Sequence, residues 1–202
     1  VSAHLGATNS MGLALANINS NTPDPSGGKI RRYKNSSEPN GVFEESAAYP
    51  VQQLAMSAYK DPIGSVKKAM EIYASHGITT AQDGASSPEA IALMQAADDQ
   101  GMVNLDIISY PVGQNGLDKS IQTIKFGSYK GRVKVGGIKL ILDGSPQGKT
   151  AYLTEPYYKP PHSESDSYKG YPLIPQKEVS KWVSIYADLN IPIMAHANGD
   201  AA

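Results

Sequence analysis

The amino-acid sequence predicts an α/β fold in which short strands alternate with helices. Helical and strand patterns follow one another at least three times between residues 61 and 200. Each clear helix pattern ends at Gly or Asn, which adopt the left-handed conformation that closes helices, and an apolar strand pattern follows. This order is typical of βα units and a parallel sheet. Two architectures fit it: an open doubly wound sheet, or part of a (β/α) barrel.

The first 50 residues follow a different pattern. The stretch NSMGLALANIN combines a capping Asn or Ser with apolar residues at helical spacing, which predicts a short helix. The stretch KIRRYKNSSEPNGVFEE predicts two short strands around a polar turn at residues 35–41. We therefore predict an insertion segment with a helix and a β-hairpin over residues 1–50, and an α/β body over residues 51–202.

The body contains four predicted helices, four predicted strands and one long loop. Apolar residues recur on one helical face in the first helix, and Pro88 near a Ser cap marks the start of the second. Apolar and β-branched runs mark the strands. The helices are residues 61–77, 87–101, 116–128 and 176–190, the strands 78–84, 103–112, 132–145 and 191–200, and the loop 150–175.

Composition and charge exclude several classes of function. The 202 residues hold 18 Lys and Arg against 19 Asp and Glu, so no excess of basic residues favours nucleic acid. We also predict no membrane partner and a cytoplasmic location, because no apolar run could span a bilayer and no signal peptide is visible. The chain has no cysteine, so a metal would have to bind His, carboxylates or a modified side chain.

Lys139 is the unusual residue of the strand 132–145. It lies in an otherwise apolar run, and strand alternation places it on the same face as Ile141 and Asp143. It could be a surface lysine whose stem lies along apolar groups. Alternatively, a buried lysine tends to lose its proton, and a neutral lysine can react with carbon dioxide to form a carbamate that bridges divalent metals. His196, which ends the next strand, is then either a core histidine or a nitrogen ligand.

Five motifs resemble those of a known family and occur along the chain in the same order as in that family. The stretches GITTAQDG, GGIKLILDGS with TAYLTEPYY, and IPIMAHANGD are similar to the amidohydrolase superfamily. HLGATNSMGLALANI, and TPDPSGGKIRR with PNGVFEE, are similar to the helix and hairpin of its amidohydrolase 3 branch, the YtcJ-like and N-substituted formamide deformylase-like hydrolases. The resemblance implies part of a (β/α)8 TIM-type barrel, about strands 2–5, with residues 1–50 as an insertion after the first strand.

The resemblance also implies a site and a reaction. Lys139, as a carbamate, and His196 would bind one or two divalent metals, with zinc expected. A small-molecule substrate would lose a C–N bond of the amide or formamide type to metal-activated water. The loop from Tyr152 to Tyr171 would line the substrate pocket, or it is a surface excursion packed by its own tyrosines. The predicted substrate contacts are His4, Asn9, Tyr157 and Asp143.

The sequence departs from the family pattern in its metal ligands. It has no His-x-His pair, and the later His and the final-strand Asp of the superfamily would lie beyond Ala202. We therefore expect a central section of such an enzyme that is inactive by itself. Two alternatives stay open: a non-catalytic binding or assembly domain that pairs with a partner or a second copy, and a doubly wound domain that binds a small molecule at Asp83, Asp143 and His196.

Overall fold

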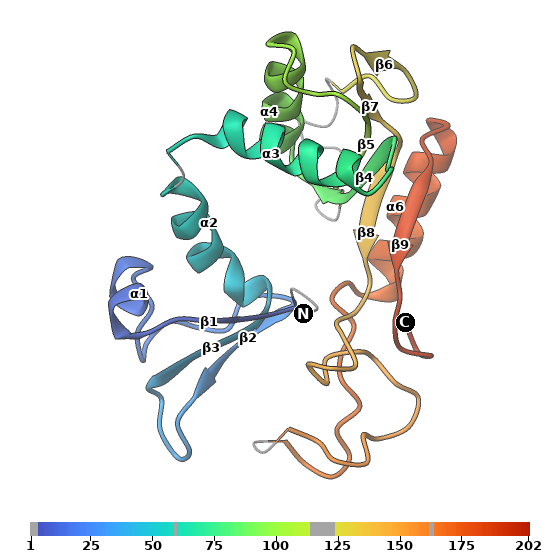
Figure 1. Cartoon of the computed structure of the whole chain (residues 1–202). Coiled ribbons are helices and arrows are strands. Elements are labelled where there is room, and N and C mark those ends of the chain that lie inside the picture. The colour runs from blue at the N-terminus through green and yellow to red at the C-terminus, as the bar shows by residue number, and fades with distance from the viewer. Residues whose placement is uncertain (1–3, 59, 114–123, 162–163) are drawn as a thin grey trace. The chain divides into compact units, whose positions relative to one another are not determined.

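The computed structural model of the chain is a mixed α/β fold (Figure 1). It describes residues 4–58, 60–113, 124–161 and 164–202. Two compact units make up the chain: unit 1 is Val1–Tyr59, Leu142–Pro175 and Ala197–Ala202, and unit 2 is Lys60–Ile141 and Gln176–His196. In the described part of the chain, no helix is both long enough and apolar enough to cross a membrane.

Unit 1 is built on a three-stranded antiparallel sheet in the order β1-β3-β2. The sheet buries Phe43 and Ile30 against Ile18, Ala47 and Ala48. The predicted helix and hairpin are present, whereas β1 and α2 were not predicted. The elements are β1 (Leu5–Ala7), α1 (Ser10–Leu15), β2 (Gly28–Arg32), β3 (Pro39–Glu45), a 3-10 turn (Ser46–Ala48) and α2 (Tyr49–Ser57).

The segment 142–175 of unit 1 has no regular helix or strand among its described residues, as the loop prediction for residues 150–175 requires. It is nevertheless held by backbone hydrogen bonds that fold it back on itself. The amide of Leu153 donates to the carbonyl of Lys169 over 2.8 Å, and the amide of Tyr157 donates to that of Tyr168 over 2.9 Å. The segment is therefore an ordered excursion, pinned at several points along its length.

Unit 2 contains parallel strands and the helices between them. β4, β5 and β7 pair in parallel, β8 pairs in parallel with β9, and a parallel bridge between Val112 and Lys139 joins the two groups. Figure 1 shows β8 and β9 side by side. The strands are β4 (Thr80–Ser86), β5 (Asp106–Pro111), β6 (Tyr129–Lys130), β7 (Val133–Val135), β8 (Ile138–Ile141) and β9 (Ile193–His196).

The helices of unit 2 begin and end where the sequence predicts. They are α3 (Pro62–Ser75), α4 (Pro88–Asp99) and α6 (Gln176–Asp188). The Ser87 hydroxyl caps α4 by accepting from the amide of Ala90 over 3.1 Å. Gly77 and Gly101 follow α3 and α4 with φ of 74° and 69°, the left-handed conformation expected of a helix-ending glycine. The helix predicted over 116–128 falls largely on residues 114–123, which lie outside the described residues.

The strand predicted over residues 132–145 is two strands instead of one. β7 ends at Val135 and β8 begins at Ile138, with Gly136 and Gly137 between them. A Cβ on Gly137 would lie 2.2 Å from the carbonyl oxygen of Pro192, so only glycine allows this approach. The break lets β5 pair first with β7 and then, at Val112, with β8.

Candidate functional site

Lys139 and His196, the two predicted metal ligands, lie on neighbouring parallel strands of unit 2. Lys139 is paired in register with Met194, and Ile141 with His196. Residues in register on adjacent strands point to the same face, and alternate residues share that face. All four side chains therefore share one face, while Ile138 and Leu140, both fully buried, point to the other.

The surroundings of Lys139 lower its pKa. Its backbone lies between β5 and β9, where its carbonyl accepts a hydrogen bond of 2.9 Å from the amide of Gly113. Partial burial removes water from the ammonium group and lowers the pKa of Lys139 below its ordinary value. The unprotonated form is thus more populated than it would be on an exposed lysine.

A side chain from β4 reaches the same face. The amide nitrogen Nε2 of Gln82 lies 3.7 Å from the sulfur Sδ of Met194 on β9, although β5 and β8 lie between these two strands. Four strands thus contribute to the surroundings of Lys139. Within the described residues, no group of three or more His, Cys, Asp or Glu is placed to hold a metal ion.

In unit 1, His4 belongs to a buried polar cluster at the end of β3. Its ring nitrogen Nδ1 lies 2.7 Å from Oε2 of Glu45, and Thr150 donates its hydroxyl to Oε1 of the same carboxylate over 2.6 Å. Thr150 is fully buried, and Glu45 is nearly so. The motifs that resemble the family contain all three residues, although only His4 was predicted to be a site residue. A visible signal was the pair of consecutive acids, Glu44 and Glu45, at the end of a strand.

Asp143 has a structural explanation in unit 1. Its fully buried carboxylate accepts three backbone hydrogen bonds, from Tyr152 (2.9 Å), Asn198 (2.9 Å) and Gly199 (2.7 Å). The side-chain amide of Asn198 donates to the carbonyl of Gly144 over 2.9 Å. Asp143 therefore ties the start of the 150–175 loop to residues 198–199, and its predicted contact with substrate stays a prediction.

Asn9 and Tyr157, the other two predicted substrate contacts, also have local partners. Asn9 caps α1, because its Oδ1 accepts from the amide of Gly12 over 3.0 Å. The hydroxyl of Tyr157 donates to the carbonyl of Ala151 over 2.9 Å, and its ring stacks on that of Tyr168. Burial, and then the negative charge of Asp143, raise the pKa of Tyr157 above its ordinary value. Their substrate contacts likewise stay predictions.

A second ionic cluster surrounds Glu44, the other acid at the end of β3. Arg31 binds Glu44 over 2.5 Å and Glu164 over 3.1 Å, and Tyr171 donates to Glu44 over 3.2 Å. Lys29 also pairs with Glu164. These bonds connect the hairpin to the irregular segment, so the tyrosine-rich loop is held to the sheet by ionic contacts as well as by its own ring stacking.

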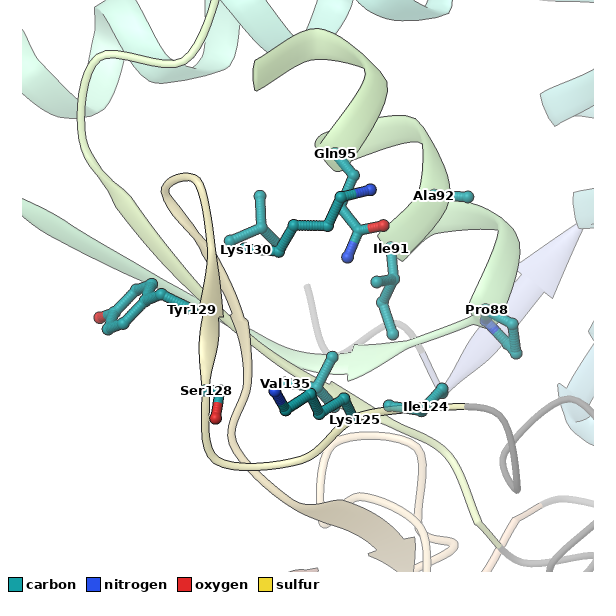
Figure 2. Close-up of a pocket in the computed structure, with 11 residues that line it drawn as sticks. Pro88, Ile91, Ala92, Gln95, Ile124, Lys125, Ser128, Tyr129, Lys130 and Val135 are labelled. Atoms are coloured by element: carbon teal, nitrogen blue, oxygen red, sulfur yellow. The ribbon is translucent and has the colours of Figure 1, made fainter. Parts of the chain in front are cut away.

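Each unit also has a cavity, and the cavity of unit 1 adjoins the ionic cluster around Arg31. In unit 2, a cavity of about 560 Å³ lies between α4 and residues 124–135, with Ile91, Gln95 and Lys130 among its lining residues (Figure 2). Neither Lys139 nor His196 lines it. In unit 1, a cavity of about 990 Å³ lies between the β2–β3 hairpin and residues 147–164, and Arg31 and Glu164 line it.

The chain is similar to one curated protein and to solved structures. It is 24% identical over 210 residues to the exoenzymes regulatory protein AepA of Pectobacterium carotovorum subsp. carotovorum, covering 98% of this chain and 43% of that protein. An uncharacterized metal-dependent hydrolase from Pyrococcus horikoshii OT3 matches with a TM-score of 0.66 and 22% identity over 98% of this chain and 38% of its own. An uncharacterized metal-dependent hydrolase from Pyrococcus furiosus matches with a TM-score of 0.65 and 20% identity, over 98% of this chain and 39% of its own.

The chain thus spans less than half the length of these proteins. At 20–22% identity, the structural likeness establishes a shared fold. The model of the amidohydrolase family matches residues 1–202, the whole chain. The chain therefore belongs to the amidohydrolase family.

Proposed function

We propose that this chain is part of a metal-dependent hydrolase that cleaves a C–N bond of the amide or formamide type in a small molecule. One observation carries the proposal: Lys139 and His196 share a face of paired parallel strands, and burial lowers the pKa of Lys139. Membership of the amidohydrolase family supports a hydrolase, and the two similar solved structures are described as metal-dependent hydrolases.

The proposal includes a partial TIM-type barrel. In it, β4, β5, β8 and β9 are about strands 2–5 of a (β/α)8 barrel. The parallel pairing, the bridge between Val112 and Lys139 and the helices between the strands support this assignment. The contact between Gln82 and Met194 fits a sheet that curls so that the face carrying Lys139 is concave.

Lys139 and His196 are the residues of this chain that would hold the metal, with zinc the expected ion. The donor chemistry fits: a lysine with a lowered pKa can form a carbamate, which offers oxygen ligands, and an imidazole offers nitrogen. A divalent metal held there would lower the pKa of a bound water and polarise a carbonyl group. The proposed substrate contacts are His4, Asn9, Tyr157 and Asp143.

The test uses the protein expressed from its complete coding sequence with zinc and bicarbonate. We expect bound zinc, electron density for a carbamate on Lys139, and turnover of N-formyl amines that chelation abolishes. Lys139→Ala should lose the zinc and the turnover. Lys134→Ala is the matched control, because Lys134 lies on the adjoining strand β7 with its ammonium 5.6 Å from the ring centre of Tyr129.

Two results would refute the proposal. One is stoichiometric zinc and unchanged turnover in Lys139→Ala. The other is the absence of both zinc and turnover in the wild-type protein, which would favour a non-catalytic binding or assembly domain. One comparison favours that second candidate, since the similar curated protein is named a regulatory protein. Sedimentation of the metal-free protein would then show whether a second copy binds.

A further inference from the structure

The cavity of about 990 Å³ in unit 1 has an exposed apolar floor, and all of its lining residues belong to that unit. Val42 alternates with Phe43 along β3, so it points away from the core that buries Phe43. Leu5 pairs in register with Glu44 and therefore lies on the same face of the sheet as Val42. Both apolar side chains line the cavity, with 42% of Leu5 and 37% of Val42 exposed. An apolar surface is thus open inside the cavity.

The turn that carries Lys149 forms part of the cavity wall. Gly148 lies close to the floor, because a Cβ at this position would be 3.3 Å from Cγ of Leu5. The amide of Lys149 donates to the carbonyl of Pro146 over 3.1 Å, which holds the backbone of the turn. The ammonium donates to the carbonyl of Pro160 over 3.4 Å, and this bond uses one of its three donors. Lys149 is therefore a half-buried cation held at the cavity wall.

Cations outnumber anions among the described residues that line the cavity. Five are lysine or arginine and three are acidic, although the formal net charge of the chain is −1. Lys34 and Lys149 form no ion pair with another described residue, so their charges are not neutralised within this part of the chain. A concave site with an excess of one charge attracts ligands of the opposite charge. The other three cations are paired with the three acids: Lys29, Arg31 and Arg32 with Glu164, Glu44 and Asp24.

We propose that this cavity binds a small organic anion, a carboxylate or phosphate group attached to an apolar body. The anionic group binds Lys149, and Lys34 adds positive charge to the same cavity, while the apolar body lies on Leu5 and Val42. A cavity of this size with an apolar surface and a few polar groups is typical of small-molecule sites. Because the turn already holds Lys149, little ordering is required when the anion binds.

Methyl NMR of the protein expressed from its complete coding sequence reads this site directly. A chelator is present, because a divalent metal would itself bind anions. Phenylacetate and phenyl phosphate are the anionic probes, and phenylacetamide is a neutral probe with the shape of phenylacetate. We expect an anionic probe to shift the methyl signals of Leu5 and Val42 with a Kd on the order of 1 mM, as suits a molecule of about ten non-hydrogen atoms. The signals of Leu15, which is exposed on α1 and does not line the described cavity, should not move.

The probes also show which chemical group the cavity selects. The anion that binds more tightly identifies carboxylate or phosphate as the preferred group. If neither anion shifts the signals of Leu5 and Val42 at about 10 mM, the cavity is not an anion site and the proposal fails. It fails as well if phenylacetamide binds as tightly as phenylacetate, because the negative charge would then contribute nothing.

Substitutions at the cavity should change the Kd of the preferred anion in opposite directions. Lys149→Met removes a cation and should raise the Kd roughly 3- to 10-fold. Glu164→Gln removes the carboxylate that neutralises Lys29 and Arg31, so the Kd should fall roughly 2- to 5-fold. Lys159→Met is the matched control, because Lys159 is exposed in the same segment and is not among the described lining residues. It should change the Kd by less than about twofold.

Lys34→Met guards against a failure of Lys149→Met to fold. Lys34 is exposed in the turn between β2 and β3, so its loss should leave the melting temperature unchanged and raise the Kd about twofold or more. A wild-type Kd in Lys34→Met and in every folded variant of Lys149, or an equal rise in Lys159→Met, would overturn the proposal. Turnover plays no part in these measurements, so this inference and the proposed function can fail separately.

Discussion

Asp143→Asn gives the clearest separation between a structural and a substrate-binding role. The carboxylate is fully buried and accepts three backbone hydrogen bonds, two at Oδ2 and one at Oδ1. Asparagine can keep an oxygen for the two donors at the Oδ2 position, from Tyr152 and Gly199. Its amide NH2 group would then face the N–H of Asn198, and two donors cannot pair.

The cost follows from these contacts. An unsatisfied buried donor costs about 1–3 kcal/mol, and hydrogen bonds to a charged acceptor contribute about 1 kcal/mol more than neutral ones. With one donor unpaired and two bonds weakened, Asp143→Asn should lower the free energy of unfolding by about 3–5 kcal/mol. Such a loss is a large part of the roughly 5–15 kcal/mol of an ordinary domain.

Urea denaturation at neutral pH measures the change. Asp166→Asn is the control, because Asp166 is exposed in the same irregular segment and its substitution should change stability by no more than about 0.5 kcal/mol. A loss below about 1 kcal/mol in Asp143→Asn would mean that the three backbone hydrogen bonds do not depend on the charge and both oxygens of Asp143, and would refute the reasoning. Unchanged stability together with lost turnover would instead assign Asp143 to the substrate.

Three further predictions concern single side chains. Burial, and then the charge of Glu44, raise the pKa of Tyr171 above its ordinary value of 10.0, so the folded state keeps this proton to a higher pH than the unfolded chain does. The stability of the fold should therefore fall as the pH rises above about 10. Tyr171→Phe should make this decline less steep when urea midpoints are measured against pH. Because burial lowers the pKa of Lys139, metal-free Lys139→Met should melt above the wild type at pH 7, by an excess that shrinks toward pH 10.5. Tyr186→Phe, which removes a buried 2.9 Å hydrogen bond to the carbonyl of Gly113, should cost about 1–2 kcal/mol in the same denaturation assay.

The helices and strands of unit 2 follow from local sequence patterns. Gly77 and Gly101 end their helices in the left-handed conformation because no other residue adopts it at so little cost. The break between β7 and β8 was not predictable in the same way. It depends on the approach of the Pro192 carbonyl to Gly137, between residues 55 positions apart in the sequence. Periodicity shows which face of an element is apolar, whereas it does not show which partner approaches that face.

In the candidate site, too, local patterns could be predicted, whereas contacts between distant residues could not. Strand alternation alone placed Lys139 on the face opposite Leu140. The pairing of β8 with β9 in the structure then placed His196 on the same face as Lys139. The contacts within the His4 cluster were beyond sequence reasoning, although its residues lie in the quoted motifs, because Glu45 meets residues 41 and 105 positions away. α2 was missed for a different reason: it buries none of its residues completely, so no clear apolar stripe marks it.

Three carboxylates are buried in the described part of the chain, those of Glu44, Glu45 and Asp143, and they differ in their partners. Asp143 accepts hydrogen bonds from backbone amides, and Glu44 binds Arg31 and a tyrosine, so these partners compensate for the burial of each charge. Glu45 alone among these three combines a strained backbone, which costs about 1–3 kcal/mol, with a bond to an ionisable ring. Stability would favour glycine at that position. The strained conformation of Glu45 is therefore held in place by its contacts with His4 and Thr150.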